Sequence, residues 1–273
     1  MKISYIVLVY KDVEALHVII DALISQTVLP DEIIIAEDGN SQEMREFCEK
    51  LFHKSIKFIH TTQEDLGWRK NRSANQAVRV SSGEYLIFND GDCVPYPHVV
   101  ASHIALMEED TILCGRRVNL GEGFSKRIRE KTTTIKEIVS HYLSLFFAMR
   151  RDGVEQYEEG IYFRPTSWLY KKLKAKRDKK ASLLGCCWGV FKKDLEYING
   201  FDEDYIKPTT GCDTDVQRRM EHFGYKFKSC RNAAIVAHLY HKEKYMQEAS
   251  IENQALMQSK EGEYICKNGL KKL

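Results

Sequence analysis

The sequence predicts an α/β fold in which a mostly parallel central sheet is flanked by helices. Its first 120 residues alternate short apolar runs with helix-like segments, and caps and turn residues separate the two patterns. Strands that are separated by helices pair in parallel through crossover connections. Acidic clusters also follow two of these runs, at the edge where open α/β sheets bind ligands. Together these observations predict a ligand site at the carboxyl edge of the sheet.

Four strands are predicted in this first part, at residues 3–10, 32–36, 56–60 and 85–89. The run 3–10 is continuous, apolar and β-branched, as expected for a strand that is buried on both faces. Asp12 and Ser41 can cap the helices after the first two strands, because their side chains accept backbone N–H groups. A third helix is predicted at 70–81, and Gly83 ends it.

The rest of the chain is expected to complete one domain over residues 1–241. Its first half is 1–120, and the weakly periodic stretch 121–182 is expected to be an insertion. Regular patterns resume in 183–241, and 242–273 is expected to form a C-terminal surface helix or tail.

The insertion has two features of its own. Apolar residues predict helix around 135–149. Between residues 164 and 180 there are eight Lys or Arg side chains and one acid, Asp178. Such a run is commonly a solvated face, but it also suits anionic lipid or a phosphorylated acceptor, and both interpretations stay open.

Composition and charge exclude some classes of function. The 41 basic and 39 acidic side chains give a net charge of only +2, so nucleic acid is not an expected partner. The eight cysteines form no CxxC pair, and the N-terminal run is not typical of a secretory signal peptide. We therefore expect a cytoplasmic protein with reduced thiols, with peripheral contact to the inner face of the plasma membrane through 164–180 as a further expectation.

The stretch YLIFNDGDCVP carries the main candidate site. In an extended segment Asp90 and Asp92 point the same way, and Gly91 between them would let a ligand approach the backbone. Paired carboxylates suit hard cations such as Mg²⁺ or Mn²⁺. The residues alone leave open a polar turn, a haloacid-dehalogenase-like phosphatase with Asp90 as nucleophile, and a nucleotide-sugar transferase.

Several motifs in order resemble the GT-A glycosyltransferases of family 2. SYIVLVYKD resembles the family's first strand, although Lys11 stands where Asn is usual. IIIAEDGNS resembles the strand that ends in DDGS, with Glu37 in place of the first Asp, and EDLGWRKNRSANQAV and NDGDCVP resemble the diphosphate segment and the DxD motif. The resemblance implies a Rossmann-like sheet and a donor site formed by Tyr10, Asp38, Arg69, Arg72 and Asp90.

The C-terminal half resembles the galactosyltransferase type of this family. TTGCDTDV resembles the motif that supplies the catalytic base, here Asp213, although Cys212 replaces the usual Glu. VAHLYHKE resembles the segment whose first histidine, here His238, joins Asp92 in binding the metal, and His241 is interpreted as a core histidine. The segment GCCWGVFKKDLEYINGFDEDY and the acidic motif imply acceptor contacts from Trp188, Gly189 and Asp215.

The activity implied by this resemblance is an inverting transfer of a hexose or N-acetylhexosamine. The donor is expected to be a UDP-sugar of the UDP-Gal, UDP-GalNAc or UDP-Glc type, and the cofactor Mn²⁺ or Mg²⁺. The acceptor is expected to be a hydroxyl of a glycan or lipid-linked glycan, as in bacterial surface polysaccharide assembly. Two alternatives remain from other classes: the phosphatase, and a nucleotide-sugar binder without catalytic activity.

Overall fold

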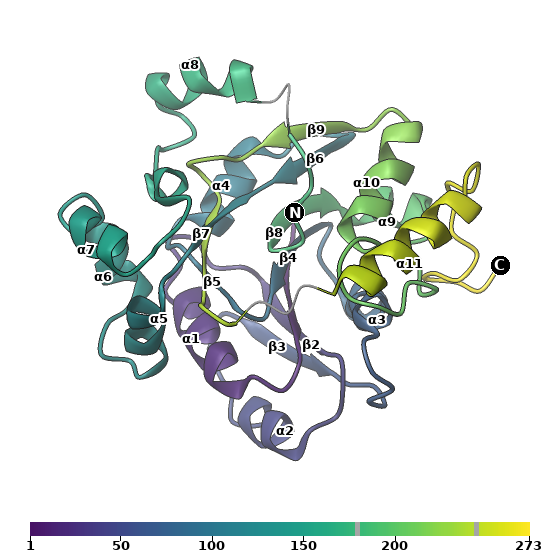
Figure 1. Cartoon of the computed structure of the whole chain (residues 1–273), viewed down its shortest axis with the longest axis horizontal. Helices are drawn as coiled ribbons and strands as arrows, with labels where there is room; N and C mark the ends of the chain where they lie inside the picture. Colours follow the sequence, from purple (N-terminus) through teal and green to yellow (C-terminus); the bar gives the residue numbers. More distant parts are fainter. Residues whose placement is uncertain (178–180, 243–245) are drawn as a thin grey trace.

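A seven-stranded sheet forms the centre of the computed structural model, which describes residues 1–177, 181–242 and 246–273 (Figure 1). The strands lie in the order β3-β2-β1-β4-β8-β6-β9. Neighbours among the first four are parallel, β6 and β9 are parallel, and β8 runs antiparallel to β4 and β6. The predicted mostly parallel sheet is therefore confirmed. The strands are β1 (Ile3–Val9), β2 (Glu32–Glu37), β3 (Lys57–Thr61), β4 (Tyr85–Asp90), β6 (Thr111–Cys114), β8 (Cys187–Phe191) and β9 (Lys226–Ser229).

Helices connect these strands and cover the sheet. Asp12 caps α1 by accepting the N–H of Ala15 at 2.9 Å, and Ser41 caps α2 by accepting the N–H of Met44 at 3.2 Å, as predicted. Side chains alternate between two hydrophobic clusters, with Tyr5 in one and its neighbour Ile6 in the other, so both faces of the sheet are buried. The helices are α1 (Val13–Ile24), α2 (Gln42–Cys48), α3 (Lys70–Val80), α4 (Val99–Leu106), α9 (Lys192–Tyr197) and α10 (Asp213–His222).

A second sheet of three strands lies beside the first. It consists of β5 (Cys93–Pro95), β10 (Ile235–His238) and β7 (Arg116–Asn119), in the order β5-β10-β7. β10 pairs antiparallel with β5, which sets His238 opposite Cys93. The Leu239 N–H also donates to the Asp92 carbonyl at 2.9 Å. This pairing brings the C-terminal histidines next to the DGD stretch.

The insertion is partly helical, as α5 (Glu122–Arg129), α6 (Ile135–Ser140), α7 (Phe146–Arg151), the 3-10 turn η1 (Tyr157–Gly160) and α8 (Trp168–Arg177). Figure 1 shows α5, α6 and α7 gathered on the side of the molecule away from α10. The helix expected around 135–149 is two short helices. Hydroxyl groups contribute to the break, because Ser140 and Ser144 donate to the carbonyls of Glu137 and His141 in the connecting turn.

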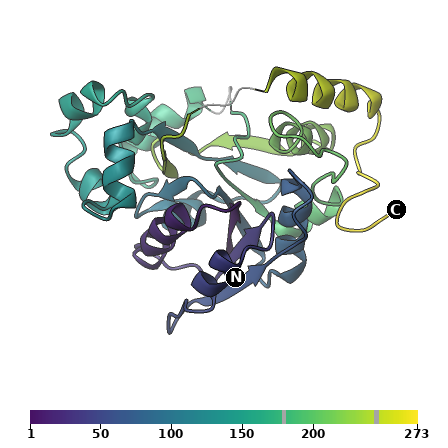
Figure 2. The same ribbon diagram turned by 60° about the horizontal axis from the view of Figure 1, so that its bottom comes forward.

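The C-terminal part contains α11 (Gln247–Ser259), which lies at the periphery in both views (Figure 2). Residues 178–180 of the basic run and 243–245 of the tail lie outside the described residues. Within the described part of the chain, none of the helices has the length and apolar character needed to cross a bilayer.

A buried histidine makes the stability of this fold dependent on pH. His103 is 0% exposed, and burial lowers its pKa to about 3. Between pH 6.5 and 3 the unfolded chain binds a proton at this residue and the folded chain does not, so stability is lost as the pH falls through this window. The contribution is about 1.4 kcal/mol per pH unit. Denaturant melts of wild type and His103→Gln at pH 6.5 to 4.5 should show a shallower pH dependence for the variant, and equal slopes would contradict this account.

Candidate active site

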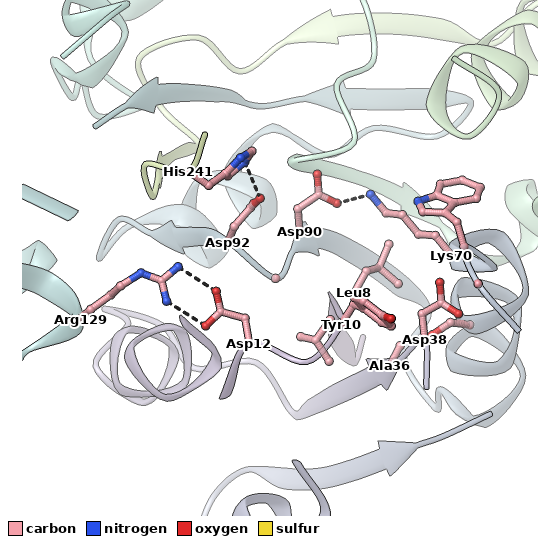
Figure 3. Close-up of a pocket in the computed structure, with 15 residues that line it drawn as sticks. Leu8, Tyr10, Asp12, Ala36, Asp38, Lys70, Asp90, Asp92, Arg129 and His241 are labelled. Carbon is pink, nitrogen blue, oxygen red and sulfur yellow. Dashed lines mark hydrogen bonds and ion pairs between the residues drawn. The ribbon is translucent and has the colours of Figure 1, made fainter. Parts of the chain in front are cut away.

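A cavity of about 460 Å³ lies at the carboxyl ends of β1, β2 and β4, as predicted for an open α/β sheet (Figure 3). Figure 3 shows the carboxylates of Asp92 and Asp38 at opposite sides of it, with Asp90 between them. Its lining includes Tyr10, Asp12, Asp38, Trp68, Lys70, Asp90, Gly91, Asp92, Arg129 and His241.

Asp38 forms one end of the cavity with a carboxylate in a fixed orientation. Its side chain is 6% exposed and accepts the Arg69 N–H and the Gln63 Nε2 group, each at 2.7 Å. Burial raises the pKa of this carboxyl, although both hydrogen bonds oppose the shift. Tyr10 is 51% exposed at the edge of the same cavity. The structure thus brings these two predicted donor residues together.

Asp90 forms an ion pair in the centre of the cavity. Lys70 Nζ lies 2.5 Å from Asp90 Oδ1, and both side chains are about three-quarters buried. Burial alone would lower the pKa of Lys70, but the nearby charges of Asp90 and Asp213 raise it above its usual value. Lys70 was not among the predicted site residues. It lies between the two predicted site positions, Arg69 and Arg72, in the GWRKNR stretch, so its place in that motif was the available signal.

Gly91 has a structural role that differs from the predicted one. A Cβ at this position would lie 2.7 Å from the Leu8 carbonyl oxygen and 3.0 Å from the Val9 Cα. The glycine is therefore required by the close approach of the chain's own strand β1. The sequence predicts that this glycine lets a ligand approach the backbone, and the contact with β1 is an additional reason for it.

Asp92 lies in a cluster with two histidines. His238 Nε2 and His241 Nε2 lie 3.3 and 3.5 Å from Asp92 Oδ2, and 3.2 Å from each other. Burial would raise the pKa of Asp92, but the two histidines hold it well below its usual value. The Cys93 thiol also donates to Asp92 Oδ1 at 3.1 Å.

The interpretation of His241 as a core histidine is wrong. Its side chain is 50% exposed and lines the cavity. β10 ends at His238, and His241 follows three residues later with its Nε2 atom 3.5 Å from Asp92 Oδ2. Spacing alone did not distinguish a ligand from a packed imidazole.

The cluster fits a divalent cation. One carboxylate oxygen and two imidazole nitrogens converge within hydrogen-bond distance of one another, and a mixed oxygen and imidazole set favours a first-row transition metal such as Mn²⁺ over Mg²⁺. Asp92, Cys93 and His238 also offer atoms that all lie within 4.8 Å of one another. A hard cation would use the oxygen and nitrogen atoms in preference to the buried thiol.

Asp213 begins α10 and lies close to the Lys70–Asp90 pair. Its Oδ2 accepts the Gly185 N–H at 2.9 Å and its Oδ1 accepts the Thr214 N–H at 2.8 Å. A Cβ at Gly185 would lie 3.7 Å from both Asp213 Oδ2 and Asp90 Oδ2. The two carboxylates therefore face one small space, although they are far apart in the sequence.

Two predicted donor residues lie elsewhere. The side chains of Arg69 and Arg72 line a separate depression together with Arg79 and Glu203. Arg69 reaches the donor cavity only through its backbone N–H, which binds Asp38, and Arg72 is exposed. The start of α3 points Lys70, not these guanidinium groups, toward the carboxylates, because successive helical residues project about 100° apart.

The three predicted acceptor residues are inside the protein. Trp188 is 2% exposed and stacks on Phe88 with ring centroids 4.5 Å apart, so its ring offers no open face to a sugar. A Cβ at Gly189 would collide with the Tyr85 hydroxyl. Asp215 is 1% exposed and binds Arg219 Nε at 2.7 Å. These three residues serve packing or internal ion pairing. The prediction that they contact the acceptor is therefore wrong.

The packing role of Trp188 can be tested. Trp188→Ala should lower the free energy of unfolding by about 3–5 kcal/mol, because it leaves a cavity beside Phe88. Denaturant titration measures this loss. Trp168→Ala is the matched control, because Trp168 is 71% exposed and its replacement should leave stability nearly unchanged. A normal unfolding free energy for Trp188→Ala would contradict the core assignment.

An ion pair from the insertion closes the side of the cavity next to Asp92. Arg129 of α5 binds both carboxylate oxygens of Asp12 at 2.8 Å (Figure 3). This bidentate pair ties α5 to the start of α1 and adds a guanidinium group to the cavity wall. Neither residue was predicted as part of the site, because 117 residues separate them in the sequence.

Curated proteins match parts of this chain at low sequence identity. Among curated proteins, the cholesterol galactosyltransferase of Borreliella burgdorferi is 30% identical over 91 residues, which cover 33% of this chain and 25% of that protein. The chain spans only 13–25% of the length of the curated relatives it matches.

Solved structures share the fold at low sequence identity. The Pyrobaculum calidifontis mannosyltransferase PcManGT, solved with GDP-Man and Mn²⁺, has a TM-score of 0.55 and 14% identity over 93% of this chain and 61% of that one. S. aureus TarS 1-349 in complex with UDP has a TM-score of 0.57 and 14% identity over 94% of this chain and 64% of that one. The family described as Glycosyl transferase family 2 matches residues 4–198. Because this match covers most of the 273 residues, the chain belongs to glycosyl transferase family 2, and it has the GT-A fold of its structural neighbours.

Proposed function

We propose that this glycosyltransferase moves a hexose or N-acetylhexosamine from a UDP-sugar to a hydroxyl of a glycan acceptor, with inversion at the anomeric carbon. The observation that supports it best is the grouping of a candidate base, Asp213, with the Asp90–Lys70 pair around Gly185. The metal-binding cluster adjoins this grouping, because Asp92 follows Asp90 by two residues.

The residues suggest a single displacement. The acceptor hydroxyl oxygen bonds to the anomeric carbon while its proton passes to Asp213, and the bond from that carbon to the diphosphate oxygen breaks with its electron pair. Mn²⁺ or Mg²⁺ held by Asp92, His238 and His241 would supply positive charge at the departing diphosphate. Lys70 adds a second positive charge and holds Asp90 in position for the donor sugar.

The choice of UDP rests on Asp38 and on the galactosyltransferase resemblance. The Asp38 carboxylate is anchored by two N–H donors, which leaves its remaining lone pairs to accept the N–H of a base edge. UDP-Gal, UDP-GalNAc and UDP-Glc are the proposed donors. Calorimetry with UDP and GDP, each with and without Mn²⁺, tests the choice. Metal-dependent binding of UDP at least tenfold tighter than GDP is expected, and a preference for GDP would overturn it.

The acceptor is proposed to be lipid-linked, with the basic segment 164–180 touching an anionic membrane. Within its described part, α8 exposes Trp168, and Lys172 lies over the Trp168 ring at 4.8 Å. An aromatic side chain next to lysines is typical of a membrane interface. Tyr170, 1% exposed, holds the helix to the protein through the Ser229 carbonyl.

Vesicle flotation tests this contact. The protein should float with vesicles that contain phosphatidylglycerol and not with phosphatidylcholine alone, and Lys171→Glu/Lys172→Glu should weaken flotation. The matched control Lys226→Glu changes an exposed lysine on β9. Equal recovery with both lipids, or no effect of the double variant, would count against the membrane contact.

A further inference from the structure

A second cavity, of about 730 Å³, adjoins the donor cavity. Trp68 lines both, so the two spaces meet at its side chain. We call the second one the α11 groove, because the first turns of α11 form one wall and the loop 206–208 forms another. Its main lining residues are Trp68, Ile206, Lys207, Pro208, Met246 and Glu252.

The α11 groove combines apolar surface with hydrogen-bonding groups. Ile206 and Met246 are 43% and 48% exposed, and Trp68 packs only partly against the core. Glu248 and Glu252 supply carboxylates at the same place. Sugar rings are bound by this combination, because their C–H faces pack on aromatic and aliphatic groups while their hydroxyls hydrogen-bond to polar ones.

The walls of the α11 groove are fixed to each other. Asn253 of α11 is 3% exposed, and its Nδ2 donates to the carbonyls of Lys207 and Pro208 at 3.1 and 3.2 Å. Lys260, just after α11, binds Asp202 and Asp204 at 2.5 and 2.6 Å. The shape of the groove is thus set before a ligand arrives, which lowers the entropic cost of binding.

The loop that forms the groove leads directly to Asp213. Thr209 has φ +86°, a left-handed conformation that is costly for a β-branched residue. Gly211 has φ +130°, and a Cβ there would collide with the Tyr205 ring. Thr210 Oγ1 is buried without a hydrogen-bond partner among the described residues. Strained residues cluster at functional sites, and Thr209 lies between the groove and the candidate base.

We propose that the α11 groove is the acceptor subsite and binds a carbohydrate ring against Trp68, with the reacting hydroxyl directed past the loop toward Asp213. This assignment rests on the proposed function above. It replaces the buried Trp188 as the aromatic platform, and it places donor and acceptor on the two sides of one side chain.

Saturation-transfer NMR on the full chain tests the assignment. The probes are methyl glycosides of glucose, galactose, N-acetylglucosamine, N-acetylgalactosamine, mannose and rhamnose, with UDP and diamagnetic Mg²⁺ present. At least one should receive saturation from the protein. Ile206→Ala/Met246→Ala should weaken that signal about tenfold through lost apolar contact. Ile251→Ala is the matched control, because Ile251 is 57% exposed on α11 and does not line the groove.

The outcomes separate this inference from the function on which it rests. UDP affinity is measured by calorimetry on the same samples and should be equal in wild type and both variants. If UDP binds but no glycoside gives a signal, or the double variant leaves the signal unchanged, the acceptor assignment is overturned and the donor site stands. If UDP does not bind to wild type, the proposed function itself fails.

Discussion

Replacement of Asp213 by Asn should lower turnover by about 100-fold or more, because the acceptor hydroxyl then has no base to take its proton. The substitution is nearly isosteric, and Oδ1 can still accept the Thr214 N–H at the start of α10. Metal and UDP binding should stay near wild type, since Asp213 does not line the donor cavity. The loss therefore belongs in kcat, and steady-state rates combined with calorimetry measure it.

A matched change on the same helix controls for effects on α10. Glu221→Gln removes an exposed carboxylate near the C-terminal end of α10 and should leave kcat unchanged. Near-normal turnover by Asp213→Asn would remove Asp213 as the base. The nearby Asp90 would then be the first carboxylate to examine, because it faces the same space around Gly185.

Asp92→Ala should abolish metal-dependent UDP binding. Asp92 is the only carboxylate in the described cluster with His238 and His241, so its loss leaves imidazoles alone for the cation. Changes even to groups that merely orient a ligand cost about 10–100-fold in metal affinity, so removal of this one should cost about 100-fold or more. Calorimetry with UDP and Mn²⁺ measures the effect.

Histidine variants refine this prediction. His241→Ala should weaken Mn²⁺ binding as His238→Ala does, since both Nε2 atoms lie within 3.5 Å of Asp92 Oδ2. Asp21→Ala is the control, because Asp21 is a half-exposed aspartate of α1 and pairs with Lys131. If Asp92→Ala binds UDP and Mn²⁺ with unchanged affinity, the metal site lies elsewhere.

The sheet could be predicted closely from the sequence. Every boundary of the four predicted strands lies within one residue of β1 to β4. For β1, β2 and β4 the reason is that buried parallel strands read as largely apolar runs, whereas β3 is an edge strand that is only partly buried. Strands β5 and β7 have three or four residues each, too few to carry a period, and the second sheet that they form with β10 was missed. That sheet is what carries His238 to Asp92.

The sequence predicted the site residues at the strand ends well, and those at the start of α3 and in the core poorly. Tyr10, Asp38, Asp90 and Asp92 all lie in the cavity, because strand ends fix their direction. The side-chain directions at the start of α3 depend on helical rotation, so arginines were chosen and Lys70 was missed. Trp188 was predicted to contact a sugar, because an aromatic ring suits both a sugar-binding surface and a hydrophobic core. Only its burial shows that it belongs to the core.

Membership of family 2 favours the transferase over the phosphatase that the DGDCV stretch alone left open. It does not identify the donor, because the solved neighbours include one with GDP-Man and one with UDP.

The most direct test of the central claim is a screen of nucleotide sugars with Mn²⁺ that reads nucleotide release. We expect UDP release from at least one of UDP-Gal, UDP-GalNAc and UDP-Glc, lost on chelation of the metal and lost in both Asp213→Asn and Asp92→Ala. Release of phosphate from a model monoester without any nucleotide sugar, with no UDP release from the panel, would contradict the account.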